Sequence, residues 1–527
     1  MLLCFAVVEE AQRQPGVSIL AATGELTETR RGSTGALPHS YNEPSMDAGD
    51  VRSDQDPREV SLQNLRDRLA AGPNDLSIRF DLATLLAAMG RTGEARDAYL
   101  QILRRDPAHR LALNHLGTLL FGTGYRTAAR TAFAEAVARH PSDPLSRVNL
   151  GSVLHDAGEF AAAREHFEIA LLLDPGNPEA HQGLAYVLAE LGDPEGARRH
   201  RRKGFQDRAL TALPYRGSGP PVPLLLLISA VGGNVPTRTL LDDRVFQTFV
   251  VVPEFYDPRQ PLPPHRIVFN AIGDPDLDEP ALAAAESLLA LTGARLVNRP
   301  SAVRATGRAG HGGLSGLPGV VIPAAVTLSR EILTAPDAAA ALAHCGFRFP
   351  LLVRTPGFQT GRHFVRVESP DALPDAIAAL PGGHLTVIEF LDARSPDGNV
   401  RKYRVMMIDG RLYPLHLAIS RNWKVHYFTA DMADRADHRA EDAAFLENMP
   451  RVLGSRAMEA LSQIQSALAL DYAGIDFGLS AAGEVLFFEA NATMVVNPPE
   501  PDPRWDYRRP AVERIFAAVR RMLTRTP

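Results

Sequence analysis

A repeat of 34 residues dominates the first half of this chain of 527 residues. Each of its four units contains two stretches with apolar residues at helical spacing, joined by a glycine and followed by a proline. One pair of amphipathic helices cannot bury its apolar face alone, so we expect the pairs to stack into a solenoid. The recurring positions are Pro73, Pro107, Pro141 and Pro175, Gly90, Gly124, Gly158 and Gly192, Leu82, Leu116, Leu150 and Leu184, and Ala95, Ala129, Ala163 and Ala197.

The period and two further features resemble the tetratricopeptide repeat (TPR). The resemblance implies an all-α TPR solenoid over residues 57–205, whose concave face binds a protein or peptide partner. The two features are a large aromatic residue in the second helix and a glycine where the two helices pack closely, found at Tyr99, Phe133 and Phe167 and at Gly117 and Gly151.

The ends of the repeat region depart from the pattern. Arg201 stands where the aromatic residue is expected, within the basic stretch ARRHRRKGFQDR. A polar capping helix, which solenoids need, is the favoured interpretation, and a patch for RNA or an acidic partner is the alternative. Proline and glycine then predict a linker over residues 206–221. Residues 1–56 lack periodicity and predict a disordered extension, or a non-native start upstream of Met46.

Composition narrows the classes of function. The formal net charge of -5 gives no general attraction to nucleic acid or to anionic membranes. The two cysteines, Cys4 and Cys345, are too few for a disulfide framework or a zinc site, which suits a reducing cytoplasm. The apolar runs at 1–8 and 222–231 are too short to span a membrane, and the first lacks the basic residues of a signal peptide. We therefore expect a cytoplasmic protein that binds neither nucleic acid nor membrane.

From residue 222 onward, short apolar strands alternate with alanine-rich helices, which predicts a mixed α/β region. Its first strand runs into VGGNVPT, which is more simply a structural turn than a ligand loop. Three later segments each read as strand, loop and returning strand: FPLLVRTPGFQTGRHFVRV, LTVIEFLDARSPDGNVRKYRVMMIDGRLYPLHLAIS and YAGIDFGLSAAGEVLFFEANATM. The second of them predicts a hairpin that turns at Asp409-Gly410.

The last segment carries three oxygen-bearing side chains. In two paired strands, Asp476 and Glu489 can face one side across the SAAGE turn, and Asn491 faces it too because side chains alternate along a strand. Mg²⁺ takes oxygen ligands, usually one or two carboxylates and the phosphates of a substrate. A solvated face is the simpler explanation for a single carboxylate. The apolar setting of Glu489 in EVLFFEAN favours a cation partner for the set.

Together the three segments resemble the ATP-grasp superfamily of carboxylate–amine ligases, which includes glutathione synthetase, D-alanine–D-alanine ligase and RimK-like enzymes. The resemblance covers residues 222–527, and it implies a pre-ATP-grasp α/β domain at 222–300 and an α+β ATP-grasp domain at 301–527. The roles that it implies are contacts to the nucleotide phosphates by Arg308 and Arg354, a flap over them at Gly357 and Gly361, adenine and ribose recognition at Glu389, Phe390 and Leu391, contact with the transferred phosphate and acyl group by Arg404, and metal binding by Asp476, Glu489 and Asn491.

Some positions depart from the superfamily. Lys is usual where Arg354 stands, and the flap usually has more glycines. Glutathione-synthetase-like enzymes are rich in glycine after the hairpin, where this chain has Trp423 and Tyr427. The segment therefore either lines an acceptor pocket or forms an aromatic core strand; its polar candidates are His416, Arg421 and Lys424. A surface ion pair is the simpler alternative for Arg354 and Arg404, each taken alone.

The residues and the resemblance predict a ligase that uses ATP and Mg²⁺, or Mn²⁺ in its place, with two ions bound. It would convert a small-molecule or peptide carboxylate to an acyl phosphate and join it to an amine, with Arg354 and Arg404 as catalytic residues. Two alternatives remain open: an adaptor whose degenerate ATP-grasp domain binds nucleotide without turnover, and a phosphotransferase that acts on a hydroxyl group.

Overall fold

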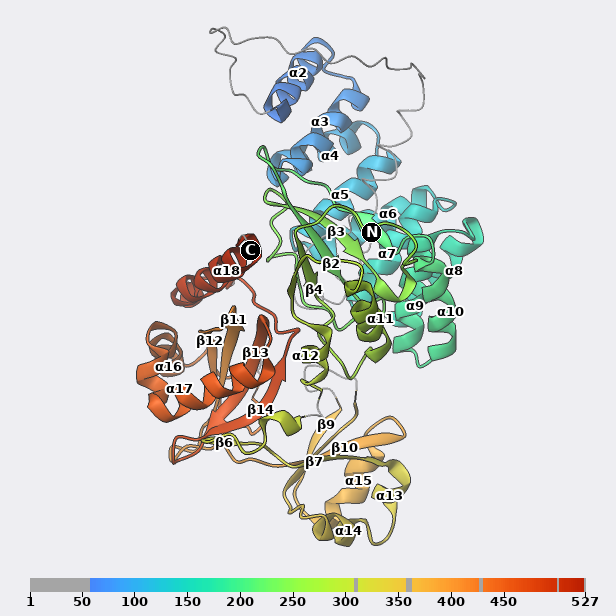
Figure 1. Ribbon diagram of the computed structural model, residues 1–527. Helices are drawn as coiled ribbons and strands as arrows, with labels where there is room; N and C mark the ends of the chain where they lie inside the picture. Colours follow the sequence, from blue (N-terminus) through green and yellow to red (C-terminus); the bar gives the residue numbers. More distant parts are fainter. Residues whose placement is uncertain (1–56, 308–310, 357–362, 426–429, 500–501, 526–527) are drawn as a thin grey trace. The chain divides into compact units, whose positions relative to one another are not determined.

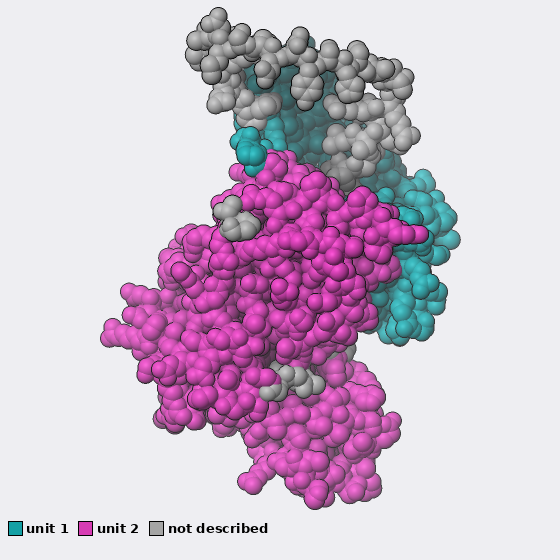
Figure 2. Space-filling model, viewed as in Figure 1, with its two compact units in different colours: residues 1–211, 216–220 teal, residues 212–215, 221–527 magenta. Residues whose placement is uncertain are grey.

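A computed structural model describes residues 57–307, 311–356, 363–425, 430–499 and 502–525. The predicted N-terminal extension, 1–56, lies outside these residues. The chain divides into two compact units, coloured separately in Figure 2. We call them the helical unit (1–211 with 216–220) and the α/β unit (212–215 with 221–527), and describe each by itself.

The helical unit consists of antiparallel helix pairs over the part of the chain that the structure describes (Figure 1). The pairs α3/α4, α5/α6, α7/α8 and α9/α10 correspond to the four sequence repeats, and α2 precedes them. The helices are α2 (Pro57–Ala71), α3 (Leu76–Ala88), α4 (Thr92–Arg105), α5 (Arg110–Gly122), α6 (Arg126–Arg139), α7 (Pro144–Asp156), α8 (Phe160–Leu173), α9 (Pro178–Glu190) and α10 (Pro194–Phe205).

Local chemistry sets where each helix begins and ends. The first helix of each pair starts at a side chain that accepts hydrogen bonds from backbone N–H groups of its first turn, and these N-caps recur every 34 residues at Asp75, His109, Asp143 and Asn177. The first helices end at glycines with positive φ, as expected where the chain reverses: Gly90, Gly124, Gly158 and Gly192.

Aromatic rings in the second helices fill the space that glycines leave open. A Cβ atom on Gly117 would lie 2.5 Å from the Phe133 ring, so only glycine permits this approach. The Phe167 ring lies between two such positions, since a Cβ on Gly183 would be 2.3 Å from it and one on Gly151 3.0 Å. The predicted close packing at Gly117 and Gly151 is thereby confirmed. In α10 the buried aromatic is Phe205, four residues after Arg201.

The α/β unit begins with a sheet in which β3, β2, β4 and β5 follow in that order and run parallel. The continuous apolar run in β2 is typical of a strand buried on both faces. The segment predicted as a linker contains β1, a strand of three residues at which the boundary between the two units falls. The elements are β1 (Leu210–Ala212), β2 (Val222–Leu227), β3 (Phe246–Val251), β4 (Ile267–Asn270), α11 (Glu279–Leu289), β5 (Arg295–Val297) and α12 (Pro300–Arg304).

A second sheet is antiparallel, in the order β7-β10-β8-β9. Three short helices cover one face, where Leu333, Leu342 and Ile377 pack against Val353 and Val387 (Figure 1). The elements are β7 (Ala325–Ser329), α13 (Arg330–Thr334), α14 (Ala338–His344), β8 (Leu351–Arg354), β9 (Phe364–Val367), α15 (Leu373–Ala378) and β10 (His384–Glu389).

The third sheet, in the order β12-β11-β13-β14-β6, is antiparallel except for the short β6. One face packs on α16 and α17 through a core that includes Tyr403, Phe477, Phe445 and Leu461. The elements are β6 (Val320–Val321), β11 (Val400–Ile408), β12 (Arg411–Ser420), α16 (Ala436–Glu447), α17 (Met449–Leu468), β13 (Tyr472–Leu479), β14 (Val485–Asn491) and α18 (Arg509–Thr524).

Two backbone features fix this sheet in place. The predicted hairpin turn is confirmed, because Asp409 and Gly410 join β11 to β12 with φ of 48° and 76°. Asn298 follows β5 with φ of 58°; its amide donates to Tyr472 O and accepts from Tyr472 N, both at 2.8 Å. This buried side chain therefore joins the parallel sheet to the start of β13.

No helix in the described ranges combines the length and the apolar character needed to cross a membrane.

Candidate functional site

Four ionisable side chains form a row across the third sheet. His416 on β12 pairs in register with Arg404 on β11, Arg404 with Asp476 on β13, and Asp476 with Glu489 on β14. Residues directly opposite on neighbouring strands share a face. Tyr403 and Val405 on either side of Arg404 enter the core beneath α16 and α17, so the row lies on the other face of the sheet.

Two β-bulges border this row. On β12 the register shifts beside His416, which leaves Leu415 without a partner, and on β14 it shifts beside Glu489, which leaves Phe488 without one. A bulge adds one residue to one strand and redirects the side chains beside it. The bulges allow Phe487 and Ala490 both to reach the core while Glu489 stays opposite Asp476.

Asp476 is the most strongly held member of the row. Arg404 donates to it from Nε at 2.6 Å and from Nη2 at 2.8 Å, and Lys402 donates from Nζ at 2.9 Å. The Asp476 side chain is 2% exposed. Burial by itself would raise the pKa of Asp476, but the two cations outweigh it and hold this pKa well below the usual range. Asp476 is therefore a charged carboxylate with two cationic partners.

The charges of the row also shift the pKa values of Arg404 and His416. Burial lowers the pKa of Arg404, but Asp476 and then Glu489 raise it above its ordinary value. His416 has a pKa well below its ordinary value, first because it is buried and second because Arg404 and Arg508 are positively charged. His416 is therefore a neutral imidazole at physiological pH, in contact with a region of positive charge.

The predicted metal ligands share this face of the sheet. Asn491 lies two residues along β14 from Glu489 and pairs with Gly474. Its Oδ1 accepts from the backbone N–H of Thr493 at 2.6 Å and from the Thr493 hydroxyl at 2.5 Å. The carboxylate and amide oxygens are the donors that a hard divalent cation takes. Both oxygens of Asp476 already accept from cationic side chains, whereas Oδ1 of Asn491 accepts from the adjacent Thr493, which an ion would displace without removing a charge. The set therefore fits one ion at Glu489 and Asn491 better than two. Among the described residues, no group of three or more His, Cys, Asp or Glu could hold a metal.

The residues predicted to recognise adenine and ribose lie at the end of β10. Glu389 is tied to Ala324 by two bonds: its N–H donates to Ala324 O at 2.8 Å, and its Oε2 accepts from Ala324 N at 3.1 Å. The Phe390 ring lies under the guanidinium of Arg366, 4.2 Å from ring centre to Cζ. Leu391 packs on a small apolar cluster that includes Ala418 and Leu486.

Arg354 belongs to a group of cations and aromatic rings that connects the second sheet to the segment after β12. Its guanidinium lies 5.8 Å from the centre of the Phe364 ring. The Trp423 ring meets Phe364 edge-on, with centroids 5.5 Å apart, and Phe390 at 6.3 Å. Lys424 Nζ donates to Phe364 O at 3.2 Å, and burial lowers the pKa of Lys424. Arg354 is thus connected to the predicted adenine-binding Phe390 through the rings of Phe364 and Trp423.

Several predicted residues fall outside the described part of the chain. They are Arg308, Gly357 and Gly361, with Tyr427 of the segment after β12. The roles predicted for Arg354, Glu389, Phe390, Leu391, Arg404, Asp476, Glu489 and Asn491 stay predictions.

Sequence reasoning missed Lys402 and Arg366. A signal for Lys402 was available, because only three of the 56 Lys and Arg residues are lysines: Lys203, Lys402 and Lys424. Lysine carries a compact charge on a flexible stem, which arginine does not reproduce. Lys402 bonds to the predicted site residue Asp476, and Lys424 is itself a polar candidate of the segment after β12.

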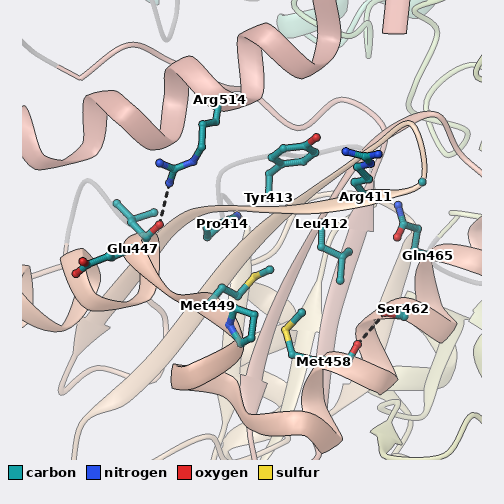
Figure 3. Close-up of a pocket in the computed structure, with 13 residues that line it drawn as sticks. Arg411, Leu412, Tyr413, Pro414, Glu447, Met449, Met458, Ser462, Gln465 and Arg514 are labelled. Carbon is teal, nitrogen blue, oxygen red and sulfur yellow. Dashed lines mark hydrogen bonds between the residues drawn. The ribbon is translucent and has the colours of Figure 1, made fainter. Parts of the chain in front are cut away.

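A separate pocket of about 640 Å³ opens between the start of β12 and helices α16, α17 and α18 (Figure 3). Leu412, Met449 and Met458 line it, and Arg514 crosses one side and donates to Leu446 O at 2.9 Å. Leu412 packs against the core beneath the sheet. The pocket contains none of the residues predicted to bind nucleotide or metal.

Comparison with known proteins bears on the helical unit. Residues 80–144, 116–178 and 148–200 match the tetratricopeptide repeat family. Residues 80–200 of the helical unit form a TPR module. Repeats of this type provide surfaces for protein–protein interaction. Comparison with curated proteins gave no match.

Three solved structures are similar to part of this chain. MamA from Desulfovibrio magneticus RS-1 is 23% identical, over 28% of this chain and 83% of that one, with a TM-score of 0.26. A thermophilic TPR protein of Thermus thermophilus is 20% identical, over 29% and 83%, with a TM-score of 0.26. PilF of Pseudomonas aeruginosa is 24% identical, over 28% and 68%, with a TM-score of 0.27.

Proposed function

We propose that the α/β unit is an ATP-grasp ligase that joins a carboxylate to an amine, and that the TPR module recruits the protein or peptide on which the enzyme acts or with which it assembles. The observation that carries the proposal is the row His416–Arg404–Asp476–Glu489 on one face of the third sheet. A TPR surface gives the enzyme a means of selecting a partner without changing its chemistry.

The fixed cations of the site support this proposal. Asp476 fixes the guanidinium of Arg404 through two nitrogens and also holds Lys402. Fixed donors stabilise charge on a transferred phosphoryl group without reorganising during the reaction. Arg404 would face the γ-phosphate, and Arg354 would contact phosphate from the second sheet. Mg²⁺, held by Glu489 and Asn491, would neutralise negative charge on the nucleotide.

The chemistry would then follow in two steps. The substrate carboxylate attacks the γ-phosphorus of ATP, and ADP leaves with the bridging oxygen. An amine next attacks the acyl carbon and displaces phosphate, which forms an amide and releases a proton. Neither step requires a side-chain nucleophile, so positioning by Arg404 and Arg354 carries the catalysis. A neutral His416 beside Arg404 can accept a hydrogen bond without adding to the positive charge.

The first test combines binding with turnover. Calorimetry of the full chain with ATP and Mg²⁺ measures nucleotide binding, and ADP release over a panel of carboxylates and amines, with hydroxylamine to trap an acyl phosphate, measures the reaction. We expect Glu489→Ala and Arg404→Ala to lower turnover at least 100-fold. Glu447→Ala removes an exposed carboxylate at the separate pocket and should leave turnover unchanged. Full turnover of Glu489→Ala would refute the assignment.

One observation favours a nucleotide-binding adaptor as the second candidate. Asp476 already has two cationic partners in the protein, which leaves less capacity for metal than a phosphotransfer site normally offers. The adaptor binds ATP but releases no ADP with any acceptor, whereas the ligase couples ADP release to amide formation. Phosphorylation of a hydroxyl acceptor, with no hydroxylamine-trapped product, would instead indicate a phosphotransferase.

A further inference from the structure

Lys402 reaches the centre of the candidate site although its sequence position gives it no predicted role. Its Nζ lies 2.9 Å from Asp476 Oδ2, and its side chain is 15% exposed. Lys402 and Arg404 are two residues apart on β11, so their side chains leave the same face of the sheet. Both therefore converge on one carboxylate.

The charge at Asp476 is already compensated by the protein. A carboxylate has about four lone-pair positions, and three N–H groups from Arg404 and Lys402 occupy positions on Asp476. The side chain is 2% exposed, so a divalent cation at Asp476 would have to displace a cationic side chain or lie beside two of them. Glu489 adds one negative charge on the neighbouring strand. No hydrogen bond to the Glu489 carboxylate occurs among the described residues.

The choice of lysine rather than arginine at position 402 also points to a role other than a structural ion pair. In a chain with three lysines among 56 basic residues, arginine is the ordinary choice for a structural ion pair, as in the Arg401 contacts to Asp397 and Glu441. A lysine ammonium is a compact point charge with three freely rotating donors, closer to a small cation than the planar guanidinium is.

We propose that Lys402 takes the place of one of the two divalent cations predicted for this site, so that ATP binds with a single ion, held by Glu489 and Asn491. This inference rests on the proposed nucleotide site. The ammonium group would satisfy Asp476 and offer its remaining protons to phosphate oxygen. Lys402 is then a binding residue for the nucleotide rather than a structural ion-pair partner.

The test counts metal ions. The full chain is equilibrated with Mn²⁺ and a non-hydrolysable ATP analogue, and bound Mn²⁺ is measured by electron paramagnetic resonance. We expect one Mn²⁺ per chain in the wild type and two in Lys402→Met, which removes the charge while Arg404 still pairs with Asp476. Lys402→Arg keeps a cation and should bind one. Lys203→Met, on an exposed part of α10, should also bind one.

Other outcomes distinguish a failure of the role of Lys402 from a failure of the nucleotide site. Two ions in the wild type, with the analogue bound, would overturn the role of Lys402 and leave the nucleotide site standing. One ion in Lys402→Met would likewise overturn it. Absence of analogue binding in the wild type would overturn both the inference and the proposed function. Should Lys402→Met unfold, amine-reactive labelling of the wild type decides the question, because the proposal requires the analogue to protect Lys402 at least 10-fold and equal labelling contradicts it.

Discussion

Gly183 and Phe167 provide a quantitative test of how the TPR helices pack. A Cβ on Gly183 in α9 would lie 2.3 Å from Cζ of Phe167 in α8, so Gly183→Ala should cost ~1–3 kcal/mol by overpacking. Phe167→Ala should cost ~3–5 kcal/mol because it empties a fully buried site. In the Phe167→Ala background the clash is gone, and alanine is a better helix former than glycine by ~1 kcal/mol.

The same substitution at Gly183 should therefore change sign between the two backgrounds. Gly183→Ala destabilises the wild type and stabilises Phe167→Ala, which gives a coupling free energy of ~2–4 kcal/mol in a double-mutant cycle. With a urea m-value of ~2 kcal/mol/M, a loss of ~2 kcal/mol lowers the midpoint by ~1 M.

The position of the tryptophans allows the two units to be followed separately in the intact chain. Both tryptophans, Trp423 and Trp505, lie in the α/β unit, while the helical unit contributes strongly to circular dichroism at 222 nm. Gly183→Ala should shift the circular dichroism transition and leave the tryptophan fluorescence transition in place. Gly93→Ala, where nothing lies within 4 Å of the new Cβ, is the control and should stabilise both backgrounds slightly. An equal effect of Gly183→Ala in both backgrounds would refute the packing argument.

Three further predictions concern buried polar groups. Burial lowers the pKa of His155 to about 4, below its value in the unfolded chain, so protonation favours unfolding. The free energy of unfolding of the helical unit should therefore fall by up to ~3 kcal/mol as pH falls from about 6.5 to about 4. Circular dichroism melts of His155→Leu should show a smaller loss over the same pH range. Burial raises the pKa of Asp442 to about 6, above its value in the unfolded chain. The free energy of unfolding of the α/β unit should therefore fall by up to ~3 kcal/mol as pH rises from about 4 to about 6. Unfolding followed by tryptophan fluorescence should show that Asp442→Asn removes this pH dependence, and its persistence would exclude Asp442 as the source. Asn298→Ala breaks both hydrogen bonds to Tyr472 and leaves buried backbone groups unpaired. The free energy of unfolding of the α/β unit, measured in urea, should therefore fall by ~2–4 kcal/mol, and a fall below ~1 kcal/mol would contradict this role.

The helical unit could be predicted well from the sequence because its information is local and repeated. The 34-residue period fixes which residues meet, and the close packing at Gly117 follows from a missing side chain opposite an aromatic ring. The capping positions also repeat, at Asp75 and its equivalents. What the period could not show is that Phe205 would be the buried aromatic of α10, where Arg201 interrupts the column, because this replacement lies outside the repeat register.

The candidate site could be predicted only in part. The Asp409-Gly410 turn and the pairing of Asp476 with Glu489 follow from turn chemistry and strand alternation. The contact between Lys402 and Asp476 does not, because it is diagonal between strands and depends on how a flexible side chain is directed. The alternation of strands and helices predicts a mixed α/β region from residue 222 onward, but no local pattern indicates that Asn298 binds its parallel sheet to β13.

The bulge at Phe488 has a consequence for any change in chain length near the site. Deleting Phe488, the extra residue of the bulge, would restore regular alternation along β14 and leave Phe487 opposite Phe477 and Glu489 opposite Asp476. Deleting a residue from the regular part of the strand, such as Ala490, would instead place Asn491 opposite Ile475, on the core face. Variants of this strand can therefore lose the bulged residue without moving Glu489 to the other face, whereas a change of length beside the bulge moves a predicted metal ligand.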